Sequence, residues 1–235
     1  MIKKYLYVLT LSFSLGFSAN IGIEYSGVVV TTNSKKEQKS IVVKRNIPKE
    51  CNNVPITNEM LWTENFAHKS VPEVCKSTYV HTKGKLLPIQ LGSEDLETYG
   101  ELEVLIHLRQ MQRDDTLLLV DSRKKDWFKY RTIPGAVNMP FIYFKQKDEY
   151  EFEYEYALLR IGVYTLKNGD YDFSKAKTLA IFCNGPWCTQ SATMINALLA
   201  IGYPEEKLKW YRGGMQDWLG AGMTSTREIN LPSTI

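Results

Sequence analysis

This 235-residue sequence has few of the features that mark nucleic-acid-binding, metal-binding or repeat proteins. Its net charge is only +3, an excess too small to predict a nucleic-acid or membrane-surface partner. The three histidines, His68, His81 and His107, are scattered and share no motif. No group of cysteines and histidines has the spacing of a tetrahedral zinc site, so we expect no metal and no cofactor. No internal repeat is visible either.

Long apolar runs are missing after the N-terminus. At the N-terminus, Lys3 and Lys4 precede an apolar run over residues 5–17, and small residues follow. This pattern predicts a signal peptide over residues 1–18, cleaved after Ser18. The run is shorter than the roughly 20 residues that span a bilayer, which argues against the alternative of an uncleaved anchor. We therefore expect a periplasmic or secreted protein with no membrane contact after cleavage.

Cysteine is scarce, and export changes how the four cysteines are interpreted. Cys51, Cys75, Cys183 and Cys188 form an even set, which in an oxidising compartment favours disulfides. Three pairings are possible and the sequence does not choose among them. Cys51–Cys75 is the natural local pair, and it would leave Cys183 and Cys188 together in one loop.

The composition, 44% hydrophobic and 23% charged, is ordinary for a globular protein with one domain plus an extension. Residues 19–80 read as that extension. β-rich segments at Gly27–Thr32 and Ser40–Lys44 flank a polar stretch and predict a hairpin. A proline-containing irregular segment with Cys51 and Cys75 follows. Residues 226–235 read as a loose tail.

Residues 81–225 alternate strand-like and helix-like patterns, which predicts an α/β fold. Continuous apolar runs are typical of strands buried on both faces of a parallel sheet. Right-handed crossovers would then place helices on both faces of this central sheet. The segments that we expect as strands are 86–89, 116–120, part of 133–140, 179–182 and 208–211, and those that we expect as helices are 93–113, 127–130, 192–199 and 215–219.

One stretch has the highest density of chemically significant residues. The strand at 179–182 ends at Cys183, a short loop with Gly185 and Cys188 follows, and a helix begins near Ala192. The unpaired amides of a helix N-terminus carry partial positive charge and favour a thiolate, so we expect them to surround the Cys183 sulfur.

Asp121 and Arg123 follow another buried strand. In a parallel sheet the carboxyl ends of the strands meet at one edge, so these residues should lie near Cys183. We expect the pair to be mainly structural and to support the loop, because an Asp–Arg pair at a strand end usually holds loops in place.

Three segments together resemble the rhodanese-like domain. Residues 118–123 are similar to a strand that ends in Asp-x-Arg, and residues 133–140 to a His-Ile-Pro-Gly-Ala-x-Asn-x-Pro signature with Thr132 in the place of His. Residues 181–218 look like that family's strand–Cys–loop–helix and its closing Gly-Gly-x-x-x-Trp. The resemblance covers about residues 86–222.

The resemblance implies a sulfurtransferase in which Cys183 carries sulfane sulfur as a persulfide. Its partners would be a small sulfur donor and a thiol acceptor, including a protein thiol. A persulfide on Cys183 could be resolved by Cys188, so both are candidate catalytic residues. The loop and anion-binding residues would be Asn184, Gly185, Trp187, Thr189, Gln190 and Ser191.

The loop also departs from that family's pattern, in which four residues separate the cysteine from an Arg followed by a Ser. Here Cys188 stands in the Arg position, and no Arg, Lys or His occurs over residues 178–206. If Ser191 is aligned with the family Ser, Gln190 takes the Arg place. The missing cation disfavours an anionic donor such as thiosulfate and leaves two alternatives open: a binding module without catalysis, and a thiol–disulfide redox protein that uses Cys183 and Cys188.

Overall fold

The computed structural model describes residues 27–34, 37–44, 46, 90–93, 95–186 and 188–228. Several predictions concern residues outside these ranges: the signal peptide, the Cys51–Cys75 pair, the strand at 86–89, Trp187 and most of the C-terminal tail. The strands are β1 Val28–Ser34, β2 Glu37–Val43, β3 Glu97–Thr98, β4 Leu117–Asp121, β5 Val137–Asn138, β6 Tyr164–Thr165, β7 Tyr171–Asp172, β8 Thr178–Phe182 and β9 Leu208–Tyr211. The helices are α2 Glu101–Met111, α3 Lys125–Tyr130, α4 Phe141–Lys145, α5 Glu151–Arg160, α6 Thr189–Ala200, α7 Gly214–Gly220 and the 3₁₀ turn η3 Glu205–Lys207.

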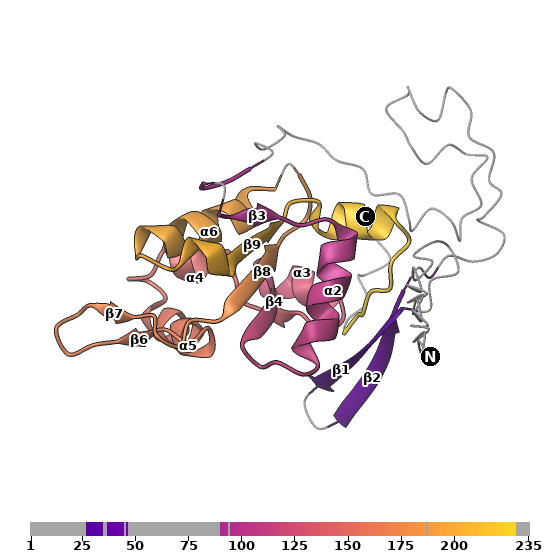
Figure 1. Ribbon diagram of the computed structural model, residues 1–235, viewed down its shortest axis with the longest axis horizontal. Coiled ribbons are helices and arrows are strands. Elements are labelled where there is room, and N and C mark those ends of the chain that lie inside the picture. Colours follow the sequence, from indigo (N-terminus) through magenta and orange to yellow (C-terminus); the bar gives the residue numbers. More distant parts are fainter. Residues whose placement is uncertain are drawn as a thin grey trace, which may run out of the picture.

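A parallel sheet lies at the centre of the described residues, as the sequence predicts. Its strand order is β3-β9-β8-β4-β5, and every pairing in it is parallel. Strands β4, β8 and β9 are central, and the two-residue strands β3 and β5 form the edges. Figure 1 shows β3, β9, β8 and β4 side by side in this order. The predicted α/β class is therefore confirmed.

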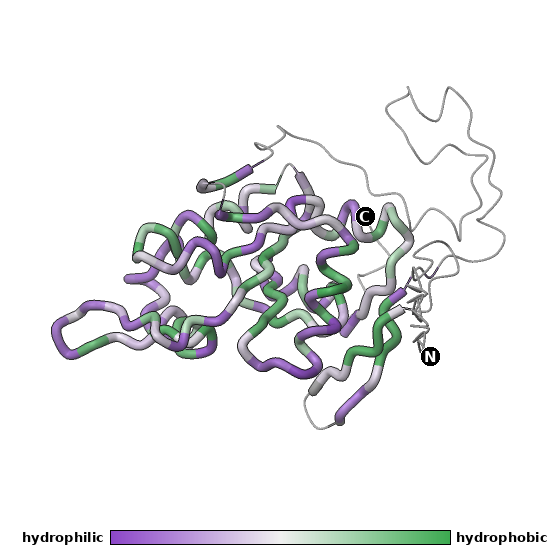
Figure 2. Tube along the Cα trace, viewed as in Figure 1, coloured by the Kyte–Doolittle hydropathy of each residue, from purple (hydrophilic) through white to green (hydrophobic). Residues whose placement is uncertain are grey.

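Alternate side chains of each central strand enter two separate cores. On one face Val120, Ile181 and Trp210 pack with residues of α4, α5 and α6. On the other face Leu119 and Phe182 pack with residues of α2 and α7. Figure 2 shows β4 and β8 as largely hydrophobic segments of the trace. Burial on both faces explains why these strands read as unbroken apolar runs.

Helix α2 begins later than predicted. The sequence suggested a helix from Ser93, but residues 97–98 form the edge strand β3, and the chain pairs on with β9 through a hydrogen bond from Tyr99 N to Trp210 O (2.8 Å). The helix starts at Glu101, where the Glu103 carboxylate accepts a hydrogen bond from the Gly100 amide (2.9 Å). The acidic residues after Ser93 resemble those of a first helical turn, but pairing with β9 holds residues 97–98 as a strand and delays the start of the helix.

The predicted N-terminal hairpin is formed by β1 and β2, antiparallel with Val30 opposite Ile41. It packs beside α2 and closes the second core (Figure 1). Val28, Val30 and Val43 are buried against that core, whereas Val29 and Val42 face outward. The hairpin is thus part of the folded domain and not a separate appendage.

Two further properties concern the part of the chain that the structure describes. No helix there has the length and apolar character needed to cross a bilayer. No group of three or more His, Cys, Asp or Glu side chains there is arranged to hold a metal ion.

Candidate active site

The carboxyl ends of β4 and β8 form the site. The two strands are neighbours with Asp121 opposite Phe182, so Asp121 and Cys183 emerge at the same edge of the sheet. Ser122 joins the two ends, because its amide and its hydroxyl both donate to Phe182 O, at 3.0 and 2.8 Å. The convergence of Asp121, Arg123 and Cys183 that the sequence predicts is present.

Arg123 is buried and bound to Asp121 through two hydrogen bonds. Its Nε donates to Oδ1 at 2.9 Å and one terminal nitrogen donates to Oδ2 at 2.7 Å. Thr132, in the position where the signature has His, donates its hydroxyl to the same carboxylate at 2.8 Å. The other terminal nitrogen of Arg123 donates to Asn184 Oδ1 at 3.2 Å. Arg123 therefore reaches the cysteine loop through Asn184.

The first turn of α7 holds the backbone of the loop. Met215 N donates to Cys183 O at 3.0 Å, and Gln216 N donates to Asn184 O at 2.8 Å. Gly214, whose φ is +55°, brings α7 close enough for these bonds. A Cβ added to Gly214 would overlap Cys183 O, and only a glycine fits at this approach.

Cys188 is the N-cap residue of α6, and it is surrounded by hydrogen-bond donors. The Asn184 side chain donates to its sulfur, with Nδ2 3.7 Å away. The neighbouring Cys183 thiol first, and then the facing amides of Asn184 and Gln190, lower the pKa of the Cys188 thiol to about 6. The α6 dipole acts in the same direction.

The Cys183 sulfur has a less polar environment. Burial, and then the neighbouring Cys188, raise the pKa of the Cys183 thiol well above its ordinary value. Its S–H donates toward Cys188 O at 3.2 Å, and its sulfur lies 3.1 Å from Ser191 Oγ. Among the described residues, the amides of Asn184 and Gln190 face Cys188, whereas the amide of Ser191 faces Cys183. The Asn184 amide points to Cys188 because the carbonyl group of Cys183, in the same peptide, is turned toward α7.

The remaining predicted loop residues have different surroundings. Gly185 O accepts a bond from Cys188 N at 2.9 Å and closes the loop. Thr189 is exposed at the start of α6, whereas Ser191 is buried. Gln190 contributes its amide to Cys188, and its side-chain Oε1 is buried without a hydrogen-bond partner among the described residues. Cys183 and Cys188 are both free thiols.

Two residues of the site were not expected from the sequence. Trp210, in β9, donates its Nε1 to Ser191 Oγ at 3.0 Å and positions the hydroxyl beside Cys183. Gly214 was read only as part of a turn. The Gly-Gly sequence at the start of α7 could have indicated a close approach of two backbone segments. Nothing in the local sequence indicates that the amides of Met215 and Gln216 bind the cysteine loop.

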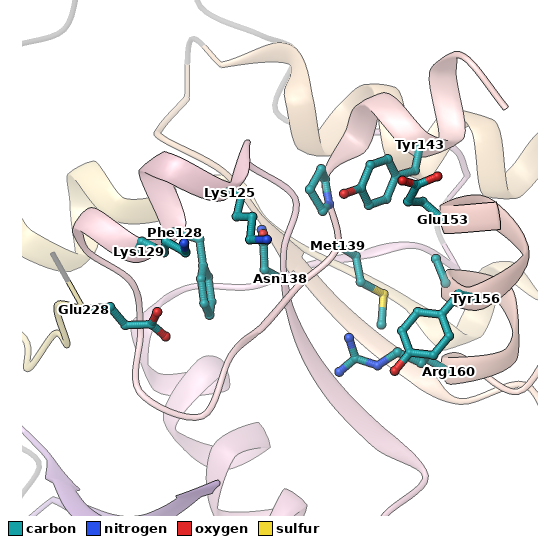
Figure 3. Close-up of a pocket in the computed structure, with 12 residues that line it drawn as sticks. Lys125, Phe128, Lys129, Asn138, Met139, Tyr143, Glu153, Tyr156, Arg160 and Glu228 are labelled. Atoms are coloured by element: carbon teal, nitrogen blue, oxygen red, sulfur yellow. The ribbon is translucent and has the colours of Figure 1, made fainter. Parts of the chain in front are cut away.

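The cysteines do not line the cavities that flank β5. Two cavities of about 400 Å³ lie there, and Phe128, Asn138 and Arg160 border both. Figure 3 shows one of them, with Tyr156 and Arg160 across from Lys125 and Phe128. Cys183 and Cys188 are 1% and 4% exposed, so their loop is closed in this conformation.

This chain is similar over part of its length to a known protein family and to several solved structures. Residues 106–221 match the family model of the rhodanese-like domain. Similar solved structures include the BH2092 protein of Bacillus halodurans, 18% identical over 57% of this chain and 78% of that one, with a TM-score of 0.40. A rhodanese with anions from E. coli is 19% identical over 47% of this chain and 98% of that one, with a TM-score of 0.30. Thiosulfate sulfurtransferase from Pseudomonas aeruginosa is 17% identical over 57% of this chain and 21% of that one, with a TM-score of 0.36. None of the curated proteins matches the chain.

Proposed function

Because residues 106–221 form a rhodanese-like domain, we propose that this protein is a sulfurtransferase that carries sulfane sulfur as a persulfide on its Cys183–Cys188 loop. One observation above all supports this function. Two buried free thiols stand together between the end of β8 and the N-terminus of α6, and the Cys183 thiol donates to the Cys188 carbonyl oxygen at 3.2 Å. The family resemblance by itself would put the persulfide on Cys183.

The donor that suits this loop is an organic persulfide. A doubly charged donor such as thiosulfate calls for a free cation, whereas Arg123 is buried and bound to Asp121. In the first step a loop thiolate attacks the outer sulfur of the donor persulfide. A new S–S bond forms, the S–S bond of the donor breaks, and the donor leaves as a thiolate with the electron pair. An acceptor thiolate, on a small molecule or a protein, then attacks the terminal sulfur and regenerates the loop thiolate.

Sulfur uptake by the purified full-length protein tests this function. After incubation with glutathione persulfide, intact mass spectrometry should show a gain of about 32 Da, one sulfur atom, that a reductant removes. Thiosulfate should give little or none. A double variant, Cys183→Ser with Cys188→Ser, is the control and should gain nothing at the loop. A folded wild-type protein that takes no sulfur from any donor would refute the function and favour a binding module without catalysis.

A thiol–disulfide redox role is the second candidate, because the two loop thiols are in hydrogen-bond contact. It predicts a reversible loss of about 2 Da at the loop on oxidation by a disulfide such as oxidised glutathione. The same mass spectra distinguish the two functions: sulfur addition supports the transferase, and loss of two hydrogens without sulfur addition supports the redox protein.

Export is part of the proposal and rests on the N-terminal sequence. With cleavage after Ser18, the mature protein begins at Ala19 in a periplasmic or secreted location. N-terminal sequencing of the protein from a fractionated bacterial host checks this. Ala19 as the first residue in the exported fraction is the expected result, and an intact Met1 in the cytosol would contradict it.

A further inference from the structure

The two loop sulfurs have different neighbours. The side-chain amide of Asn184 donates to Cys188 Sγ at 3.7 Å, and the backbone amides of Asn184 and Gln190 face the same sulfur. Among the described residues, Cys183 has the amide and hydroxyl of Ser191 beside it, but its sulfur also lies 3.2 Å from the carbonyl oxygen of Cys188, which accepts its S–H and would repel a negative charge there. Two thiolates in contact repel each other, so the loop holds one negative charge, and it belongs on the sulfur with more donors.

Tertiary contacts aim the Asn184 amide at Cys188. Helix α7 binds the carbonyl groups of Cys183 and Asn184, and this turns the peptide between them so that the Asn184 N–H faces the Cys188 sulfur. The Gln190 amide belongs to the first turn of α6, where Cys188 occupies the N-cap position, and it faces the sulfur without a capping hydrogen bond of ordinary geometry.

The side chain of Asn184 connects a buried cation to the same sulfur. Arg123 donates to Asn184 Oδ1 at 3.2 Å, and Asn184 Nδ2 faces Cys188 Sγ at 3.7 Å. The Arg123 contact fixes which end of the amide points to the sulfur, and it polarises the amide so that Nδ2 becomes a stronger donor. Asn184 thereby stabilises a thiolate in a loop that has no Arg, Lys or His of its own.

We propose that Cys188 is the catalytic thiolate that accepts the sulfur, and that Asn184 is the positioning residue that transmits the charge of Arg123 to it. This deepens the proposed sulfurtransferase function and rests on it. Cys183 is then also a positioning residue, whose thiol lies beside Cys188 and donates to the Cys188 carbonyl oxygen. In the uptake step the Cys188 thiolate forms the bond to the sulfane sulfur, the donor thiolate leaves, and Cys183 keeps its proton.

Alkylation with iodoacetamide over pH 5–9, read by peptide mass mapping, measures the thiolate without any sulfur donor. Cys188 should be labelled before Cys183, with a midpoint at least one pH unit below the value of about 8.5 for an ordinary thiol. Because the loop is closed, the difference in thiolate absorbance between wild type and Cys188→Ser is titrated as well, and this signal needs no access for a reagent.

Variants separate the proposed roles. Asn184→Ala should raise the midpoint of Cys188 and slow its labelling at pH 6 by about tenfold, since it removes a charge-assisted donor. Asn196→Ala, on the exposed side of α6, is the matched control and should change nothing. Cys183→Ser keeps a donor beside Cys188 and should keep the midpoint low, whereas Cys183→Ala should raise it.

The outcomes distinguish this assignment from the proposed function. Sulfur uptake on Cys183, or preferential labelling of Cys183, overturns the assignment and leaves the sulfurtransferase function intact. An unchanged Cys188 midpoint in Asn184→Ala overturns the role of Asn184. A wild-type protein that labels at Cys188 with a low midpoint but takes up no sulfur supports the assignment of the thiolate and refutes the transferase.

Discussion

The carboxylate of Asp121 is fully buried and accepts four hydrogen bonds. Three come from Arg123, through its backbone amide, its Nε and one terminal nitrogen, and the fourth from the Thr132 hydroxyl. This pair fixes the geometry at the end of β4 and, through Arg123, the orientation of Asn184. Asp121 and Arg123 are paired, and their link to a cysteine through Asn184 was not expected from the sequence.

Replacing Asp121 by Asn should therefore be costly. Asp121→Asn leaves the Arg123 charge buried without a counter-ion, and the free energy of unfolding should fall by about 3–5 kcal/mol. Urea denaturation measures this change, and Asp126→Asn on the exposed start of α3 is the control. A loss of under about 1 kcal/mol would mean that Arg123 finds another partner or reaches water.

Helix α2 carries a buried histidine against the sheet. His107 Nε2 donates to Leu118 O at 3.0 Å, so this nitrogen carries the proton, and the ring lies edge-on to Tyr99. Nδ1 is buried without a hydrogen-bond partner among the described residues. Burial first, and then Lys209, lower the pKa of His107 below its ordinary value of 6.5.

This histidine makes stability depend on pH. Below about pH 6.5 the unfolded chain binds a proton at residue 107 that the folded protein rejects, so the free energy of unfolding decreases as the pH falls. The stabilising contribution is complete above pH 6.5 and is lost as the pH falls through the lower folded pKa. His107→Gln can still donate to Leu118 O but cannot titrate. It should show a weaker loss of stability between pH 7 and 5 in urea titrations, and an equal loss would contradict this account.

The β1–β2 hairpin contributes its inward side chains to the domain core. Val30 is fully buried, and a Cβ added to Gly135 would meet it at 2.7 Å, with Leu108 as the next neighbour. Val29, the next residue along the strand, is 58% exposed. Val30 and Val29 therefore lie on opposite faces of β1, so replacing each of them compares the stability contributed by its buried and its exposed face.

Truncation of each valine should give different results. Val30→Ala should lower the free energy of unfolding by about 2 kcal/mol, from lost burial and the cavity that remains. Val29→Ala should change it by no more than about 0.5 kcal/mol. Urea denaturation of both variants at one pH is the measurement. Similarly small losses of unfolding free energy in both variants would show that packing of the hairpin does not stabilise the core.

Across the whole molecule, the cysteine loop depends on the fit of α7 against it. Gly214→Ala places a Cβ against the Cys183 carbonyl at a positive φ. The clash and the backbone strain should cost about 1–3 kcal/mol or more and displace the α7 amides from the loop. The Asn184 amide would then move from the Cys188 sulfur, so the alkylation midpoint of Cys188 should rise.

Gly169 provides the matched control for this prediction. It has a φ of +88° in the β6–β7 turn, and a Cβ added there meets nothing within 4 Å. Gly169→Ala should therefore show backbone strain alone, with no change in the alkylation midpoint of Cys188. A shift of that midpoint in Gly169→Ala, or none in Gly214→Ala, would contradict the proposed dependence on α7.

The amino-acid sequence alone was sufficient for the central strands and their common edge. Strands β4 and β8 are encoded by local apolar runs, and strand–helix alternation allows few topologies for these strands and β9. The convergence of Asp121 and Cys183 followed from the rule that ligand-binding residues lie at the carboxyl ends of parallel strands.

Tertiary structure alone decided where α2 begins and which sulfur the amides surround. Pairing with β9, distant in the chain, makes residues 97–98 a strand in place of a helical turn. Contacts with α7, about 30 residues away, turn the loop so that its amide meets Cys188 and not Cys183. The same short loop sequence is compatible with several backbone conformations. The orientation of each peptide group therefore depends on hydrogen-bond partners from distant parts of the chain, which the local sequence does not specify.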